Sequence, residues 1–193
     1  MSNCITELVN NITTENCDDK AKVGIETAVI INLSHIDPTQ TIWANSEVTS
    51  FSLKSGTSGL KMDSYRDMNA YNTALTPTTS DALGGFTHSL TGSLIGGSSL
   101  ENAQTSKQLA DGNFVVVVQT TYGKNTANQY KVFGLENGLR ALEINHSSNE
   151  SDSRITFNLS TADTAKENDA YLILNNGTVA EMEAEFASLF ANV

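Results

Sequence analysis

The fold of this chain is decided by the segment Leu109-Ala-Asp-Gly-Asn-Phe-Val-Val-Val-Val-Gln-Thr-Thr-Tyr-Gly-Lys-Asn-Thr-Ala-Asn-Gln-Tyr-Lys-Val-Phe-Gly-Leu-Glu-Asn-Gly-Leu139. Within it, Phe114–Val118 is a short β-branched run bounded by Asp111-Gly112 and by Gly123-Lys-Asn125. Such a run is typical of a strand covered on both faces. Gln129–Leu135 predicts a return strand. The segment therefore predicts a helix end, a buried strand, a polar turn and the second strand of a hairpin.

The composition is that of one globular domain of moderate size. The chain has 193 residues, of which 39% are hydrophobic and 2 are proline; this suits a folded domain with a core of its own. No apolar run approaches the roughly 20 residues that cross a bilayer. The N-terminus has neither the basic region nor the apolar stretch of a secretory signal. We therefore expect synthesis in a cytoplasm and no membrane partner.

The charge of the chain argues against direct binding of nucleic acid. The net charge is −11, from 22 acidic and 11 basic residues. The basic residues are scattered, with no cluster of the kind that grips phosphates. A protein this acidic repels DNA, which is useful where DNA must pass without sticking.

No pattern in the sequence indicates chemistry. Nucleophile elbows, Walker loops, zinc-protease motifs and dinucleotide glycine patterns are all missing from the sequence. The histidines His35, His88 and His146 are far apart, and neither Cys4 nor Cys17 belongs to a paired-cysteine metal motif. A local disulfide between the two cysteines stays open beside two free thiols, which a cytoplasmic product favours. We expect no enzyme activity, and no catalytic residue, metal or cofactor.

Two strands are predicted before the middle of the chain. Val23–Ile36 is a strand that Asp37-Pro38 ends, because proline cannot donate to a strand ladder. Glu47–Lys54 is a weaker strand. Its expected faces are Thr49, Phe51 and Leu53 on one side and Val48, Ser50 and Ser52 on the other.

Gly85–Ile95 has the cleanest alternation of the chain and predicts a half-buried strand with one polar face. His88 falls on its apolar face, which favours a structural histidine over a catalytic one. A short helix follows to about Ala110. Its expected start is the capping box Ser98-Ser-Leu-Glu101, and its expected end is Gly112 in a left-handed conformation.

After the hairpin, Leu139–Ile144 and Arg154–Ser160 predict a second antiparallel pair, and Ala170–Leu174 predicts a last short strand. The capping-box pattern Thr178-Val-Ala-Glu181 opens a terminal helix with an apolar stripe. That stripe packs either on the core of its own chain or on a neighbouring subunit. Its members are Val179, Met182, Phe186, Leu189, Phe190 and Val193.

Residues 55–85 carry too little periodicity for a secure strand and form a long segment for a compact domain. Exposed tyrosine and methionine suit a contact between proteins. A surface meander packed on its own domain is the alternative. The suspected contacts between subunits are Met62, Tyr65, Met68 and Tyr71 in this segment, and Phe186 and Phe190 in the terminal helix.

The chain resembles the tail tube proteins of tailed bacteriophages, particularly the versions from phages of Bacteroidetes-type hosts. The resemblance lies in Leu109–Val118, in Tyr130–Leu139 and in Arg154-Ile-Thr-Phe-Asn-Leu-Ser160, and it covers roughly the C-terminal half. It implies an antiparallel β-sandwich or incomplete barrel with a flanking helix. It also implies hexameric rings that stack into a tube for DNA, with terminator, sheath or hub proteins as partners. The implied location is the virion tail, after synthesis in the cytoplasm of the host bacterium.

The expected organisation is an arm over residues 1–22, a mainly β domain over 23–177 with a long insertion loop at 55–85, and an amphipathic helix over 178–193. Part of the net charge of −11 is expected to line the channel. A head–tail connector, terminator or hub ring protein is an alternative. So is a carbohydrate-binding β-sandwich module, although the aromatic share of 7% and the single tryptophan, Trp43, argue against it.

Overall fold

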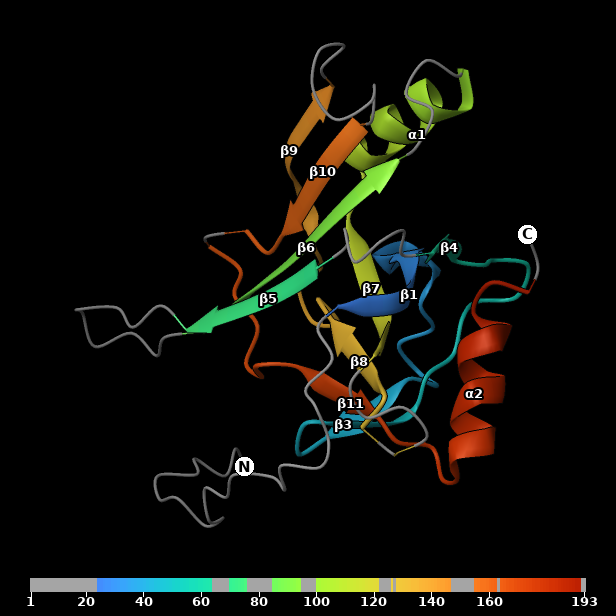
Figure 1. Ribbon diagram of the computed structural model, residues 1–193. Coiled ribbons are helices and arrows are strands. Elements are labelled where there is room, and N and C mark those ends of the chain that lie inside the picture. Colours follow the sequence, from blue (N-terminus) through green and yellow to red (C-terminus); the bar gives the residue numbers. More distant parts are fainter. Residues whose placement is uncertain are drawn as a thin grey trace.

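The computed structural model describes residues 24–63, 70–75, 85–94, 100–121, 126, 128–146, 155–162 and 164–191. The expected N-terminal arm, Tyr65, Met68 and the expected helix cap Ser98 lie outside these residues. Within them the protein is mainly β, with two sheets and two α-helices. The sheets do not close into a barrel. Figure 1 shows their arrangement.

The larger sheet has seven strands in the order β2-β3-β11-β8-β7-β1-β4. Neighbours pair antiparallel except β11 and β3, which are parallel. In chain order its strands are β1 (Ile25–Asn32), β2 (Ile42–Ala44), β3 (Glu47–Ser50), β4 (Leu60–Asp63), β7 (Phe114–Thr120), β8 (Tyr130–Phe133) and β11 (Leu172–Leu174).

The smaller sheet has four strands in the order β5-β6-β10-β9, all antiparallel. The helix α1 lies beside β9 at one end of this sheet, and α2 covers the larger sheet (Figure 1). The bounds are β5 (Ala70–Leu75), β6 (Phe86–Leu94), β9 (Arg140–His146), β10 (Ile155–Ser160), α1 (Leu100–Asp111) and α2 (Val179–Ser188).

The seven-stranded sheet is the middle layer of the molecule, and both of its faces are apolar. On β7, Val115 and Val117 belong to the cluster under α2, whereas Val116 and Val118 belong to the cluster toward the smaller sheet. All four valines are fully buried. The predicted strand covered on both faces is therefore confirmed, and so are the hairpin with β8 and the second pair of β9 with β10.

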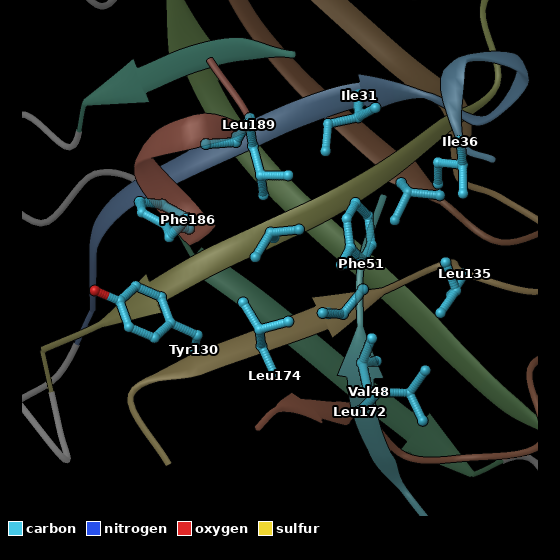
Figure 2. Close-up of a cluster of buried hydrophobic side chains, with 14 of the residues drawn as sticks. Ile31, Ile36, Val48, Phe51, Tyr130, Leu135, Leu172, Leu174, Phe186 and Leu189 are labelled. Atoms are coloured by element: carbon cyan, nitrogen blue, oxygen red, sulfur yellow. The ribbon is translucent and has the colours of Figure 1, made fainter. Parts of the chain in front are cut away.

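The terminal helix docks on its own chain. Figure 2 shows Phe186 of α2 and Leu189, the residue after its end, over the larger sheet, with the ring of Phe186 beside that of Tyr130; the two ring centroids are 4.8 Å apart. The predicted capping box is present, because the Thr178 hydroxyl accepts a hydrogen bond from the Glu181 N–H at 3.4 Å and the Glu181 carboxylate accepts one from the Thr178 N–H at 2.7 Å. Local sequence thus fixes where this helix begins.

Two of the predicted strands have different limits. β1 ends at Asn32, because Leu33–His35 turns as a 3-10 helix before the proline is reached. β3 ends at Ser50 rather than at Lys54; Val48 is buried and Thr49 is exposed, so the two lie on opposite sides of the strand as expected. Phe51 is buried outside the strand, where its N–H donates to the Glu185 carboxylate of α2 at 3.0 Å.

The expected loop at 55–85 contains two strands. β4 pairs with β1 at the edge of the larger sheet, and β5 pairs with β6 at the edge of the smaller one. Gly112 does not adopt the expected left-handed conformation. A Cβ atom at position 112 would instead collide with the ring of Phe114, so the lack of room for a side chain explains the glycine. The left-handed glycines are elsewhere, and they include Gly134 and Gly138, with φ of +74° and +80°, in the turn between β8 and β9.

Candidate functional site

The outer face of the smaller sheet is rich in hydroxyl and amide groups. On β6 the side chains alternate, so that His88 and Leu90 point to the core while their neighbours point away. β10 alternates in the same way. Neither of these two central strands carries an Asp, Glu, Lys or Arg residue. We call this surface the polar face: Asn72, Thr87, Ser89, Thr91, Ser93, Thr156, Asn158 and Ser160.

The strand register places the members of the polar face in rows across the sheet. Thr91 lies opposite Asn158, and Ser93 lies opposite Thr156. Among the four strands of this sheet, only the edge strand β9 carries Asp, Glu, Lys or Arg residues, namely Arg140 and Glu143. Hydroxyl and amide groups donate and accept hydrogen bonds but carry no charge. The polar face is therefore a neutral surface on a protein of net charge −11.

Both sheets end in strands that lack a second neighbour among the described residues. Three of these edge strands carry a large hydrophobic side chain that is more than half exposed: Ile42 on β2, Leu60 on β4 and Leu142 on β9. Monomeric proteins protect such edges with charge, proline or a covering segment, since unpaired backbone groups and apolar side chains recruit another chain. These edges are the best candidates for contacts between copies.

Met62 and Tyr71 make contacts within their own chain. Both are partly buried against the cluster between the sheets. The Tyr71 ring lies 4.8 Å from that of Phe133, and its hydroxyl accepts a hydrogen bond from Lys131 Nζ at 3.0 Å. Met62 also lines a cavity of about 740 Å³ beside Leu109 of α1, so part of its surroundings is open. For these two residues the packing favours the alternative of a meander on its own domain.

The two phenylalanines of the terminal helix are also in contact with their own chain. Phe186 is 5% exposed, and Phe190 is partly buried against the same cluster. Their rings meet edge to face with centroids 5.8 Å apart. Phe186 therefore has little exposed surface left for a contact with another subunit.

A buried polar joint connects the two sheets. The His88 Nδ1 atom accepts a hydrogen bond from the Gly134 N–H at 3.2 Å, and Nε2 donates to the Asp169 carbonyl at 2.8 Å. These partners define a neutral imidazole, and burial lowers the pKa of His88. The interpretation of His88 as a structural histidine is confirmed.

Glu167 is the second member of this joint and was not predicted from the sequence. It is 3% exposed, and its carboxylate accepts hydrogen bonds from the backbone N–H groups of Glu136 at 3.1 Å and of Asn137 at 3.0 Å. Burial raises the pKa of Glu167 in spite of these bonds. The joint fixes the β8–β9 turn against the start of β6, since the Glu167 backbone also pairs with Phe86.

In the described part of the chain, no group of three His, Cys, Asp or Glu side chains is placed to hold a metal ion. Neither helix there has the length and apolar character needed to span a membrane. No family model, curated protein or solved structure matches the chain. The candidate site is therefore defined by its own geometry: the polar face, the exposed edges and the joint that holds the sheets together.

Proposed function

We propose that this protein is a structural subunit of a phage tail tube, in which copies form hexameric rings that stack and conduct DNA. The observation that carries the proposal is the polar face. Its two central strands are free of charged residues although the whole chain has a net charge of −11. Such a surface suits a wall along which a polyanion moves.

The physical reason lies in how proteins hold DNA. Duplex DNA carries one charge per roughly 1.7 Å, and lysine or arginine side chains bind it by releasing its counterions. The polar face offers hydrogen bonds without that attraction, so DNA beside it is not retained. In this arrangement Glu143 and Arg140 of β9, opposite Asn158 and Ser160, lie on the channel side with opposite charges, so the acidic residues expected along the channel come from connecting segments.

Ring formation would give the exposed edges a partner. Cyclic assembly places the same edge of every subunit against a different surface of the next, which closes the ring. Leu60 on β4 and Leu142 on β9 would then be buried. The proposal therefore explains why apolar side chains lie on strands that most monomers protect.

The test is the oligomeric state of the purified protein, measured by sedimentation velocity and negative-stain microscopy. We expect six-fold rings that stack into tubes. Leu142→Arg should abolish assembly, because it replaces the exposed apolar side chain of this edge with a charged one. Leu100→Arg is the matched control, since Leu100 is 74% and Leu142 is 73% exposed but Leu100 lies at the start of α1.

The outcomes separate the possible functions. A protein that stays monomeric at high concentration would contradict the proposal. Single rings that never stack would instead favour a connector, terminator or hub. Equal loss of assembly in both leucine variants would show that the edge of β9 has no special role.

A further inference from the structure

A second cavity lies at one end of the larger sheet. Its volume is about 590 Å³, within the range of roughly 300–1,000 Å³ that small-molecule sites occupy. The segments that form it are the turn after β1, β2, the residues after β3, the β8–β9 turn and the segment before β11. Its lining residues are Leu33, Ile36, Pro38, Trp43, Lys54, Leu135, Glu136, Asn137 and Asn168. We call it the Trp43 pocket.

The pocket combines one aromatic side chain with an apolar base. Trp43 is 37% exposed, whereas Ile36 and Leu135 are buried. An exposed indole next to a hollow offers a flat apolar surface to a ligand and a ring N–H that donates a hydrogen bond. Trp43 is the only tryptophan of the chain. The tryptophan fluorescence of the protein therefore reports on the surroundings of this one side chain.

The polar groups of the pocket are held in place by the fold. The Glu136 carboxylate accepts hydrogen bonds from the Asn168 N–H at 3.0 Å and from the Asn168 side-chain amide at 2.9 Å. The Asn137 amide donates to the Lys166 carbonyl at 2.9 Å, and Lys54 Nζ donates to the Ser34 carbonyl at 2.6 Å. Groups fixed before binding lose little freedom when a ligand arrives.

These groups still have hydrogen-bonding capacity. A lysine ammonium has three donors, of which one is used by Ser34. An ionised carboxylate accepts about four hydrogen bonds, and the Asn168 groups occupy only part of the capacity of Glu136. The pocket therefore presents donors and acceptors close together beside an aromatic ring. This is the pattern that adjacent hydroxyl groups on a ring with an apolar face would satisfy.

We propose that the Trp43 pocket binds a neutral saccharide, with the sugar ring against the indole and its hydroxyl groups on Lys54, Glu136 and Asn137. One cation and one anion line the pocket, so their charges cancel and no anionic ligand is favoured. A ligand of a dozen non-hydrogen atoms at typical efficiency binds with a dissociation constant on the order of 1 mM. This site lies within one chain and does not depend on assembly.

The same chemistry serves a free sugar and a unit of a polysaccharide. The test is a titration of the 193-residue protein, followed by Trp43 fluorescence. The probes are D-glucose, D-galactose, D-mannose and N-acetyl-D-glucosamine, followed by maltose, cellobiose and dextran. We expect a saturable change in emission with at least one neutral sugar. Tighter binding of a disaccharide or of dextran would identify a polysaccharide as the source.

Two variants test the assignment to this pocket. Lys54→Met keeps the tryptophan and should weaken binding at least tenfold. Trp43→Ala should abolish binding, measured by saturation-transfer NMR because its fluorescence is lost. Tyr171→Ala is the matched control, because Tyr171 is also 37% exposed but lies outside the pocket. Circular dichroism verifies that each variant is folded.

The results that would overturn the proposal are equally direct. They are no response to any neutral sugar, full binding by both pocket variants, or stronger binding of inorganic phosphate or glucuronate than of any neutral sugar. A loss of assembly in Trp43→Ala without sugar binding by the parent protein would make the pocket a contact between subunits.

Discussion

The two sheets differ in how many of their faces are covered by other parts of the chain. The larger sheet is covered on both faces, by α2 on one side and by the smaller sheet on the other, so β1 and β7 are buried along most of their length. Within the described part of the chain, the smaller sheet is covered on one face only, and β6 and β10 alternate between apolar and polar side chains. Burial on both faces therefore gives stability, whereas burial on one face leaves a surface free for function.

This contrast sets where substitutions should matter. A residue between the sheets contributes to both layers, because it fills space that nothing else fills. A residue of the polar face contributes little to the folded state, since water replaces its hydrogen bonds. The four predictions below test this contrast in order of decreasing effect on the free energy of unfolding.

The largest effect is expected for Phe133→Ala. Phe133 is buried between the sheets, where its ring contacts Tyr71 at a centroid distance of 4.8 Å and His88 at 5.3 Å. Loss of a buried phenylalanine costs about 3–5 kcal/mol. Urea unfolding measures the change. A loss below about 1 kcal/mol would show that the layers are not packed together as described.

A smaller effect is expected for Glu167→Ala, which leaves the N–H groups of Glu136 and Asn137 without their acceptor. Such a loss costs about 1–3 kcal/mol. Glu143→Ala is the control, because Glu143 is an exposed carboxylate on β9. An equal loss in both variants would contradict the role of the joint.

The pH dependence of the Glu167→Ala variant provides a second readout. Burial raises the pKa of Glu167 above 4.5, so the folded protein binds this proton more tightly than the unfolded chain does. Its contribution to stability is complete below pH 4.5 and is lost as the pH rises through the folded pKa. The variant lacks this contribution. The difference in unfolding free energy between the two proteins should therefore be larger at low pH than at neutral pH.

The helix cap should have a moderate effect. Thr178→Ala removes the hydroxyl that accepts from the Glu181 N–H, and loss of such a cap costs about 1 kcal/mol. Thr164→Ala removes the same hydroxyl from an exposed turn and should change nothing measurable. Thermal unfolding of the two variants compares them. Equal melting temperatures would mean that packing alone holds α2.

The smallest effect is expected on the polar face. Ser93→Ala should change the free energy of unfolding by less than about 0.5 kcal/mol, as most surface substitutions do. The measurement is again urea unfolding. A loss above 1 kcal/mol would show that the hydroxyl groups of this face stabilise one another, which would remove the contrast between the sheets.

The features that the sequence predicted are those with a local pattern. The valine run of β7, the alternation of β6 and the Thr178–Glu181 cap each depend on residues a few positions apart. The short edge strands β4 and β5 were missed. Each has one neighbour in its sheet, and β4 mixes charged and apolar side chains that remain largely exposed.

The features that could not be predicted depend on distant residues. The partner of Phe51 is Glu185, 134 positions away, and this contact rather than strand periodicity decides how β3 ends. Glu167 accepts a hydrogen bond from Asn137, 30 positions away, and Trp43 and Asn168 line one pocket only because the ends of several strands converge. The periodicity of the sequence does not show which distant residues come together. The polar face was predictable as a pattern, whereas the joint and the Trp43 pocket required the fold.

The position of β11 has a consequence for the order of events during synthesis. This strand lies between β8 and β3 and is the parallel neighbour of β3. The hairpin of β2 and β3 therefore has no place in the larger sheet until the ribosome has passed Leu174. Pairing of segments so distant along the chain is intrinsically slow. Until Leu172–Leu174 has been made and inserted, the hairpin of β2 and β3 therefore lacks the strand that joins it to β8.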